Sequence, residues 1–278
     1  MGKRYASKTT LQSLMGVFKT KFDVLKKFDE TLLNSLEDKV YGTCAPDGEA
    51  AKWSYTLDED NHSIVLQQYT GSDTSVIVYS NYFIDGKKYL TKIGSNDTNN
   101  TSSYMFTNNT NITSITFNEG VDTSNNTNIS YMFNECNSLT TINGLENLNT
   151  SKVTTMYRMF RNCNKLTSLD LHTWNTSNVT YMDQMFQFCS SLTSLDLSSF
   201  DVSNIDNMRM MFHDCSSLTS LDLRNWDISK CTDMNYIFNA CTNLKEIKAT
   251  NGKWVIPSGC STTGMFGGCG VSSVTYYD

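Results

Sequence analysis

One pattern of apolar and polar positions repeats seven times along the chain. Each copy places Met or Ile before a phenylalanine, and every copy but the first places Cys three residues after it. In most copies an apolar-x-x-apolar-x-apolar run follows, as in Leu166, Leu169 and Leu171. The seven phenylalanines, spaced 26 to 28 residues apart, are Phe106, Phe133, Phe160, Phe186, Phe212, Phe238 and Phe266. A fixed period of this length is typical of a solenoid, in which each unit buries its apolar face on its neighbours.

The repeat predicts one short strand per coil. The run around Leu169, Asp170 and Leu171 alternates apolar and polar residues, which is the period of a half-buried strand. Equivalent strands of successive copies are expected to stack in parallel and in register, ~4.8 Å apart. The Met-Phe-x-x-Cys segment is expected on the opposite side as a short helical turn. Asn, Ser and Thr between these segments are suited to satisfy turn backbone groups locally.

The repeat resembles a known family. Residues 178–206, "NVTYMDQMFQFCSSLTSLDLSSFDVSNID", look like the BspA-type leucine-rich repeat, a 26-residue repeat of bacterial surface proteins. Repeat length, Met-Phe, Cys and the leucine triad agree in several consecutive copies over about residues 96–278. The resemblance implies an adhesin or interaction protein and not an enzyme. Surface members of the family usually carry export or anchoring signals, and none is visible in this sequence.

The segment before the repeats is β-rich. The runs Trp53–Leu57 and Ile64–Tyr69 flank a polar turn, and Asp85-Gly86 lies between the strand-like runs Tyr82–Ile84 and Tyr89–Ile93. Asp-Gly between such runs is a strong hairpin signal. We expect a hairpin module that covers the open edge of the first repeat strand.

Residues 9–40 show an apolar period of seven. The predicted oligomerisation seam consists of Leu11, Met15, Phe18, Phe22, Leu25, Leu32 and Leu36. A seam of about four heptads is the minimum for a coiled coil, and the alternative is an amphipathic helix packed on the protein's own body. Two phenylalanines in the seam favour a bundle wider than a dimer, such as a homotrimer.

These patterns together predict a mixed β/α fold in three parts. An N-terminal α-helix for assembly or anchoring occupies residues 1–42, and a β-hairpin cap occupies residues 43–95. A leucine-rich-repeat solenoid of seven copies, with parallel stacked short strands, occupies residues 96–278.

Charge and hydropathy restrict the classes of partner that we expect. The formal net charge is −6, which argues against nucleic-acid binding. Residues 1–40 carry a net charge of +3 and the remainder −9, so the two parts are expected to face different partners. The sequence shows no uninterrupted apolar run of ~18 residues, so we expect no membrane insertion. No signal peptide is recognisable at the start of the sequence.

The sequence contains few signs of a catalytic, cofactor-binding or metal-binding site. His62, His172 and His213 are scattered, and no metalloprotease, hydrolase or phosphate-loop motif is present. The nine cysteines contain no C-x-x-C pair, which disfavours zinc. The cysteines of the repeat column are expected to be reduced, buried spacers, because in-register neighbours stand too far apart for a disulfide. We therefore expect a protein that is not an enzyme and needs no cofactor.

The outward positions of the central strands form a candidate binding face. This face consists of Thr167, Asp170, Thr193, Asp196, Thr219 and Asp222. Repeated hydroxyls and carboxylates suit a repetitive polar ligand such as a glycan, and the alternative is a solvated surface. The aromatic column Trp174, Phe200 and Trp226 is expected in the core, with sugar stacking as the alternative.

A protein that presents a binding surface to an outside partner could belong to one of two locations. The first is a phage virion, in which residues 1–42 oligomerise or dock on other virion proteins and the solenoid of a fibre, tail or capsid-decoration component binds a host-surface glycan or protein. It would be made in the host cytoplasm without a signal peptide. The alternative is a bacterial cell-surface adhesin of the BspA type. An enzyme with an unfamiliar site is the third hypothesis, and it requires a clustered set of titratable residues.

Overall fold

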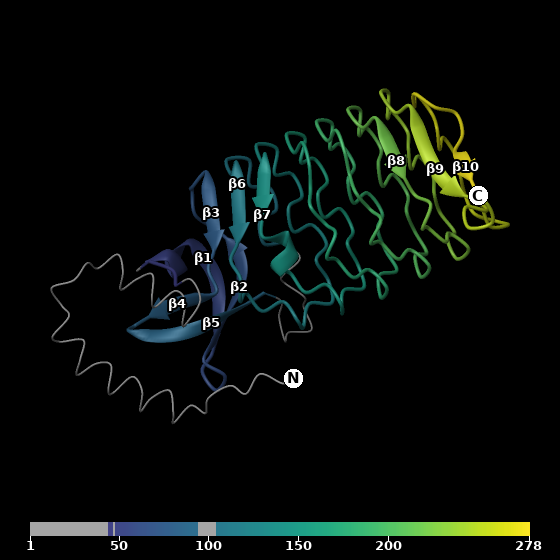
Figure 1. The fold of residues 1–278 in the computed structure, drawn as a ribbon. Helices are drawn as coiled ribbons and strands as arrows, with labels where there is room; N and C mark the ends of the chain where they lie inside the picture. The colour runs from purple at the N-terminus through teal and green to yellow at the C-terminus, as the bar shows by residue number, and fades with distance from the viewer. Residues whose placement is uncertain (1–43, 47, 94–103) are drawn as a thin grey trace. The chain divides into compact units, whose positions relative to one another are not determined.

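The computed structural model describes residues 44–46, 48–93 and 104–278, and Cys44–Asp278 form one compact unit (Figure 1). The predicted helix at residues 1–42 and its seven seam residues lie outside the described residues. The coiled-coil and homotrimer predictions depend on that segment and remain predictions.

Two antiparallel hairpins build the cap. A short 3-10 helix, η1 (Glu49–Lys52), precedes a sheet with the strand order β1-β2-β5-β4. The hairpin turn at Asp85 and Gly86 takes positive φ values of 51° and 74°, as the Asp-Gly signal predicts. The central pair, β2 and β5, runs parallel. The four strands are β1 (Trp53–Asp58), β2 (Ser63–Tyr69), β4 (Asn81–Ile84) and β5 (Lys87–Ile93).

Parallel strands stack in register on one side of the coils, as the repeat predicts. A sheet with the order β3-β6-β7 joins the cap to the first coils, and a second sheet with the order β8-β9-β10 follows near the C-terminal end (Figure 1). A 3-10 helix, η3 (Leu145–Asn147), follows β7. The strands are β3 (Ser75–Val78), β6 (Ser114–Phe117), β7 (Thr141–Asn143), β8 (Ser220–Asp222), β9 (Glu246–Thr250) and β10 (Thr275–Tyr277).

The two central copies depart from this expectation. Residues 166–171 and 192–197 are not strands, and within them the only backbone bond between coils runs from the Thr193 amide to the Thr167 carbonyl at 3.1 Å. Charge offers a physical reason. Asp222 pairs with Lys248 where β8 and β9 form a ladder, whereas Asp170, Asp196 and Asp222 follow one another in successive coils. Like charges on adjacent strands destabilise pairing, and opposite charges favour it.

The opposite side of each coil is a pair of tight turns, so the predicted short helical turn is wrong. Around Phe186, for example, Gln184 and Phe188 have φ values of 59° and 62°. Left-handed residues break helical propagation. The backbone of these turns nevertheless pairs with the next coil. The amides of Gln184, Phe186 and Phe188 donate to the carbonyls of Arg209, Met211 and His213 at 2.8 to 3.0 Å. This turn-side ladder continues through the coils from Tyr131 to Gly267.

Polar residues at the corners satisfy backbone groups locally, as expected. The Asn175 and Asp201 carboxamide and carboxylate oxygens accept the amides two residues ahead, at 3.0 and 2.9 Å. Buried Thr176 links two coils, because its hydroxyl donates to the Asp201 carbonyl at 2.9 Å and accepts the Asp201 amide at 2.8 Å. The corners of the coils are therefore hydrogen-bonded without regular secondary structure.

Stacked phenylalanines form the centre of the core. Phe160, Phe186 and Phe212 have centroid separations of 5.6 and 5.8 Å and interplanar angles of 2° and 8°. The same stacking extends from Phe106 to Phe266. Trp174, Phe200 and Trp226 are at most 2% exposed, so this column belongs to the core and the sugar-stacking alternative is wrong.

The column cysteines combine packing with hydrogen bonding. From Cys136 to Cys241 each buried thiol of the column donates to the carbonyl of the phenylalanine one coil earlier, at 3.0 to 3.1 Å. Burial raises the pKa of the Cys189 thiol to about 12, which suppresses the thiolate that nucleophilic or metal-binding chemistry needs. Cys44, Cys260 and Cys269 are half-buried.

Candidate binding face

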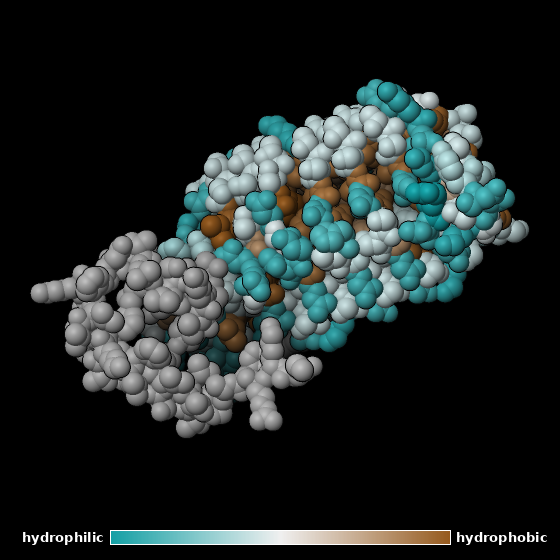
Figure 2. Space-filling view, in the orientation of Figure 1, coloured by the Kyte–Doolittle hydropathy of each residue, from teal (hydrophilic) through white to brown (hydrophobic). Residues whose placement is uncertain are grey.

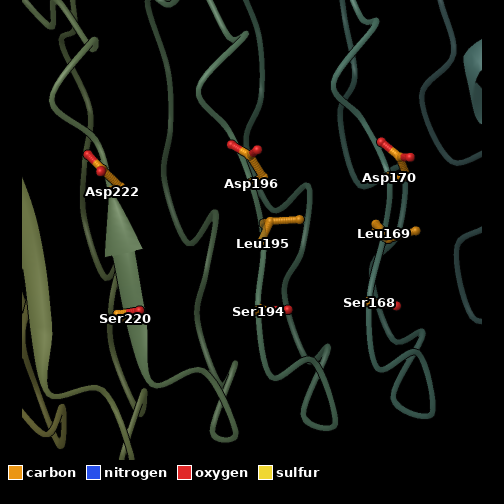
Figure 3. A pocket seen from close by; sticks show the side chains of 8 residues that line it. All are labelled: Ser168, Leu169, Asp170, Ser194, Leu195, Asp196, Ser220 and Asp222. Atoms are coloured by element: carbon orange, nitrogen blue, oxygen red, sulfur yellow. The ribbon is translucent and has the colours of Figure 1, made fainter.

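A shallow groove of about 490 Å³ lies on the strand side where the backbone ladder lapses (Figure 3). It crosses three successive coils. Its lining residues are Ser168, Leu169, Asp170, Ser194, Leu195, Asp196, Ser220 and Asp222. The concave site therefore coincides with the lapse in the strand-side ladder.

The groove is apolar at its base and polar along its edges. Leu169 and Leu195 are each 8% exposed, whereas the serines and aspartates beside them are exposed. Figure 2 shows a band of apolar surface that crosses the coils between rows of polar residues. Figure 3 shows the serine hydroxyls on one side of the leucines and the aspartate carboxylates on the other.

The three groove aspartates are each held by residues two positions ahead. Asp170 contacts the His172 ring nitrogen Nδ1 at 2.5 Å, and Asp222 forms a bidentate pair with Arg224, whose closest N–O distance is 2.7 Å. These contacts lower the pKa of both carboxyls. All three aspartates are therefore fixed acceptors at neutral pH.

Asp196 lies in the middle of the groove, and among the described residues its carboxylate is hydrogen-bonded only within its own turn. The Ser198 amide donates to its Oδ1 at 2.9 Å, and this contact lowers the carboxyl pKa although Asp170 and Asp222 oppose it. No described group of three or more His, Cys, Asp or Glu is placed to hold a metal ion.

The predicted threonines are exposed but do not line the groove. The Thr193 hydroxyl donates to the Thr167 carbonyl at 3.2 Å, so it contributes to the contact between coils. Ser168, Ser194 and Ser220 occupy the groove in their place. The sequence signal was available, because Ser168 and Asp170 lie two residues apart and a strand period of two directs them to one face.

No catalytic set assembles from the described histidines. His172 is exposed beside Asp170, whereas His213 lies on the turn side, where its ring packs against Phe188 at a centroid distance of 5.2 Å. His62 lies in the turn between β1 and β2. In the part of the chain that the structure describes, no helix is long and apolar enough to cross a membrane.

One family model matches the chain in three overlapping segments. A family described as "Mycoplasma protein of unknown function, DUF285" matches residues 59–168, 100–207 and 169–274. No curated protein matches the chain.

Three solved structures are similar to the chain. A leucine-rich repeat protein of T. pallidum is 20% identical, with a TM-score of 0.48, and covers 77% of this chain and 89% of its own. A leucine-rich cell surface protein of Faecalibacterium prausnitzii is 21% identical, with a TM-score of 0.43. The match covers 74% of this chain and 54% of the length of that protein. A leucine-rich repeat protein of Bacteroides ovatus is 16% identical, with a TM-score of 0.41 and coverages of 76% and 67%.

The family matches span most of the repeat region and the second half of the cap. With the stacked Phe and Cys columns already described, they agree with the resemblance seen in the sequence. The chain belongs to the DUF285 family, and its coils are leucine-rich repeats of the BspA type.

Proposed function

We propose that this chain is a non-enzymatic adhesion protein of the bacterial cell surface that binds a glycan in the strand-side groove. The groove itself carries the proposal, because it is a concave site at which hydroxyls, carboxylates and an apolar strip recur from coil to coil. A repeating site of this kind suits a repeating ligand.

The chemistry of the groove favours a sugar chain. Sugar hydroxyls donate hydrogen bonds to ionised carboxylates such as Asp196, and the charge of the acceptor strengthens those bonds. The serine hydroxyls both donate and accept. Leu169 and Leu195 provide the apolar base on which the C–H face of a pyranose can rest. Because three carboxylates surround the site, we expect a neutral glycan to bind in preference to an acidic one.

The bacterial surface is favoured over the virion as the setting. The family to which the chain belongs is described from Mycoplasma, a bacterial genus. The virion hypothesis rested on the lack of a recognisable export signal and on the predicted N-terminal seam, which lies outside the described residues.

Binding to an array of neutral glycans, followed by titration of the best ligand, tests the proposal. Asp196→Asn is expected to weaken binding about tenfold, the effect of losing roughly 1.4 kcal/mol from a charged hydrogen bond. Asp201→Asn is the matched control, because Asp201 accepts the Ser203 amide just as Asp196 accepts that of Ser198, but lies outside the groove. Equal affinities of the Asp196→Asn variant and the native chain, or the absence of any glycan ligand, would exclude the groove as the site.

A further inference from the structure

A row of tyrosines follows the turn side of the first coils, on the side of the coil opposite the strands. Tyr104, Tyr131, Tyr157 and Tyr181 come from four successive coils. Their ring centroids are separated by 5.2, 5.1 and 6.3 Å, so the rings form a continuous aromatic row. Tyr104 and Tyr181 are 48% and 39% exposed, so the row presents aromatic surface to solvent.

Arg158 is fixed over this row. Its guanidinium carbon lies 4.7 Å from the centre of the Tyr157 ring and 5.9 Å from that of Tyr131. Its Nε donates to Gln184 Oε1 at 2.9 Å, and no other side-chain hydrogen bond of Arg158 is present among the described residues. The two Nη groups therefore remain as a pre-oriented pair of donors, the arrangement that binds a carboxylate through two parallel bonds.

A second arginine extends the positive charge along the row. Arg158 donates its amide to the Asp183 carbonyl at 3.1 Å, and Gln184 donates its amide to the Arg209 carbonyl at 2.9 Å, so the three coils are direct neighbours here. Asp183 is 7% exposed, whereas both arginines are partly exposed. The row therefore presents two partly exposed guanidinium groups to solvent, with the partly exposed Asp233 carboxylate in the next coil, on a chain whose net charge is −6.

We propose that this tyrosine–arginine ridge, defined by Tyr131, Tyr157, Tyr181, Arg158 and Arg209, binds an acidic polysaccharide. A pyranose ring lies against the exposed Tyr181 ring at the end of the row, and the Arg158 fork holds a uronate carboxylate. An acidic peptide is disfavoured, because the backbone of the ridge is already paired in the turn-side ladder and cannot accept an added strand. The proposal is independent of the groove, whose carboxylates repel such a ligand.

Calorimetric titration of the full chain with polygalacturonate tests the ridge. We expect saturable binding that weakens as salt is added, and at least tenfold weaker binding of dextran and of polyglutamate. Arg158→Gln is expected to weaken the binding of polygalacturonate at least tenfold. Arg224→Gln removes the same charge from the strand side, where Arg224 pairs with Asp222, and is expected to leave the affinity unchanged.

Four results would overturn the proposal. They are no binding of polygalacturonate at low salt, equal losses in the Arg158→Gln and Arg224→Gln variants, no loss in Arg158→Gln, and binding of polyglutamate as tight as that of polygalacturonate. Thermal unfolding shows whether the Arg158→Gln variant folds. If it does not, the affinities of the Arg209→Gln and Arg224→Gln variants for polygalacturonate are compared instead, with the loss expected in Arg209→Gln. A glycan that binds the groove and not the ridge would leave the proposed function intact while excluding this second site.

Discussion

Two aspartates in neighbouring segments show how strongly position in the coil sets the chemistry of one residue type. Asp196 is exposed at the strand side, and its contacts with Ser198 lower the pKa of its carboxyl. Asp183 lies within the turn-side ridge, where burial raises the pKa of its carboxyl and its Oδ1 has no hydrogen-bond partner among the described residues. The sequence alone indicated that Asp196 points outward, but nothing in the string around Asp183 marks a buried carboxylate.

Asp183→Asn is expected to stabilise the fold near neutral pH. A carboxyl whose pKa is raised by folding supports the folded state below its ordinary pKa and loses that support as the pH rises through the folded value. The gain in unfolding free energy over the native chain, on the order of 1 kcal/mol for relief of an unpaired buried group, should therefore be present near neutral pH and fade in acid. Urea unfolding at both pH values measures it.

Asp201→Asn provides the control of opposite sign. Hydrogen bonds from Ser203 lower the pKa of the Asp201 carboxyl, so this carboxylate stabilises the fold above its ordinary pKa, and its removal should cost stability at neutral pH. A stability difference for Asp183→Asn that does not change with pH would contradict the assignment of a buried, raised carboxyl.

At the scale of the element, the period of the apolar residues correctly predicts what is buried but not the conformation of the turn. The Phe and Cys columns are in the core as the pattern indicates, because burial depends only on which side of the coil a residue faces. The paired left-handed turns were missed because residues such as Arg158, Gln184 and Met210 occupy positions that usually call for Gly or Asn. Asn108 and Asn162 carry the signal at one position of their coils, and among the described coils the last one carries it at both, where Gly264 and Gly268 have φ values of 63° and 65°.

Ala240→Gly is expected to stabilise the chain by roughly 0.5–1 kcal/mol. Ala240 has a φ of 60°, a conformation that costs a residue with a Cβ atom about 1–2 kcal/mol and that Gly adopts freely. The greater flexibility of Gly in the unfolded chain offsets part of this gain. Denaturant unfolding measures the change, with Ala249→Gly in buried β9 as the control that should destabilise. A loss of stability in both variants would show that the turn geometry is not strained.

At the scale of the whole unit, the two sides of the solenoid differ in how successive coils are hydrogen-bonded. The turn-side ladder and the phenylalanine stack run through the successive coils, whereas the strand-side ladder stops between β7 and β8. The sequence predicts the stacking because most copies carry the same apolar positions. It does not reveal the lapse in the strand-side ladder, because the repeat alone predicts one uninterrupted sheet. The groove aspartates are among the predicted site residues, whereas the groove serines are not, although their two-residue spacing from the aspartates indicates the same face.

Residue-resolved amide hydrogen exchange tests this central claim most directly. If the turn side holds the coils together and the strand side opens into the groove, the amides of Gln184, Phe186 and Phe188 will exchange far more slowly than those of Ser194, Leu195 and Asp196. Equal protection of the two sets, or slower exchange in the groove, would contradict the account.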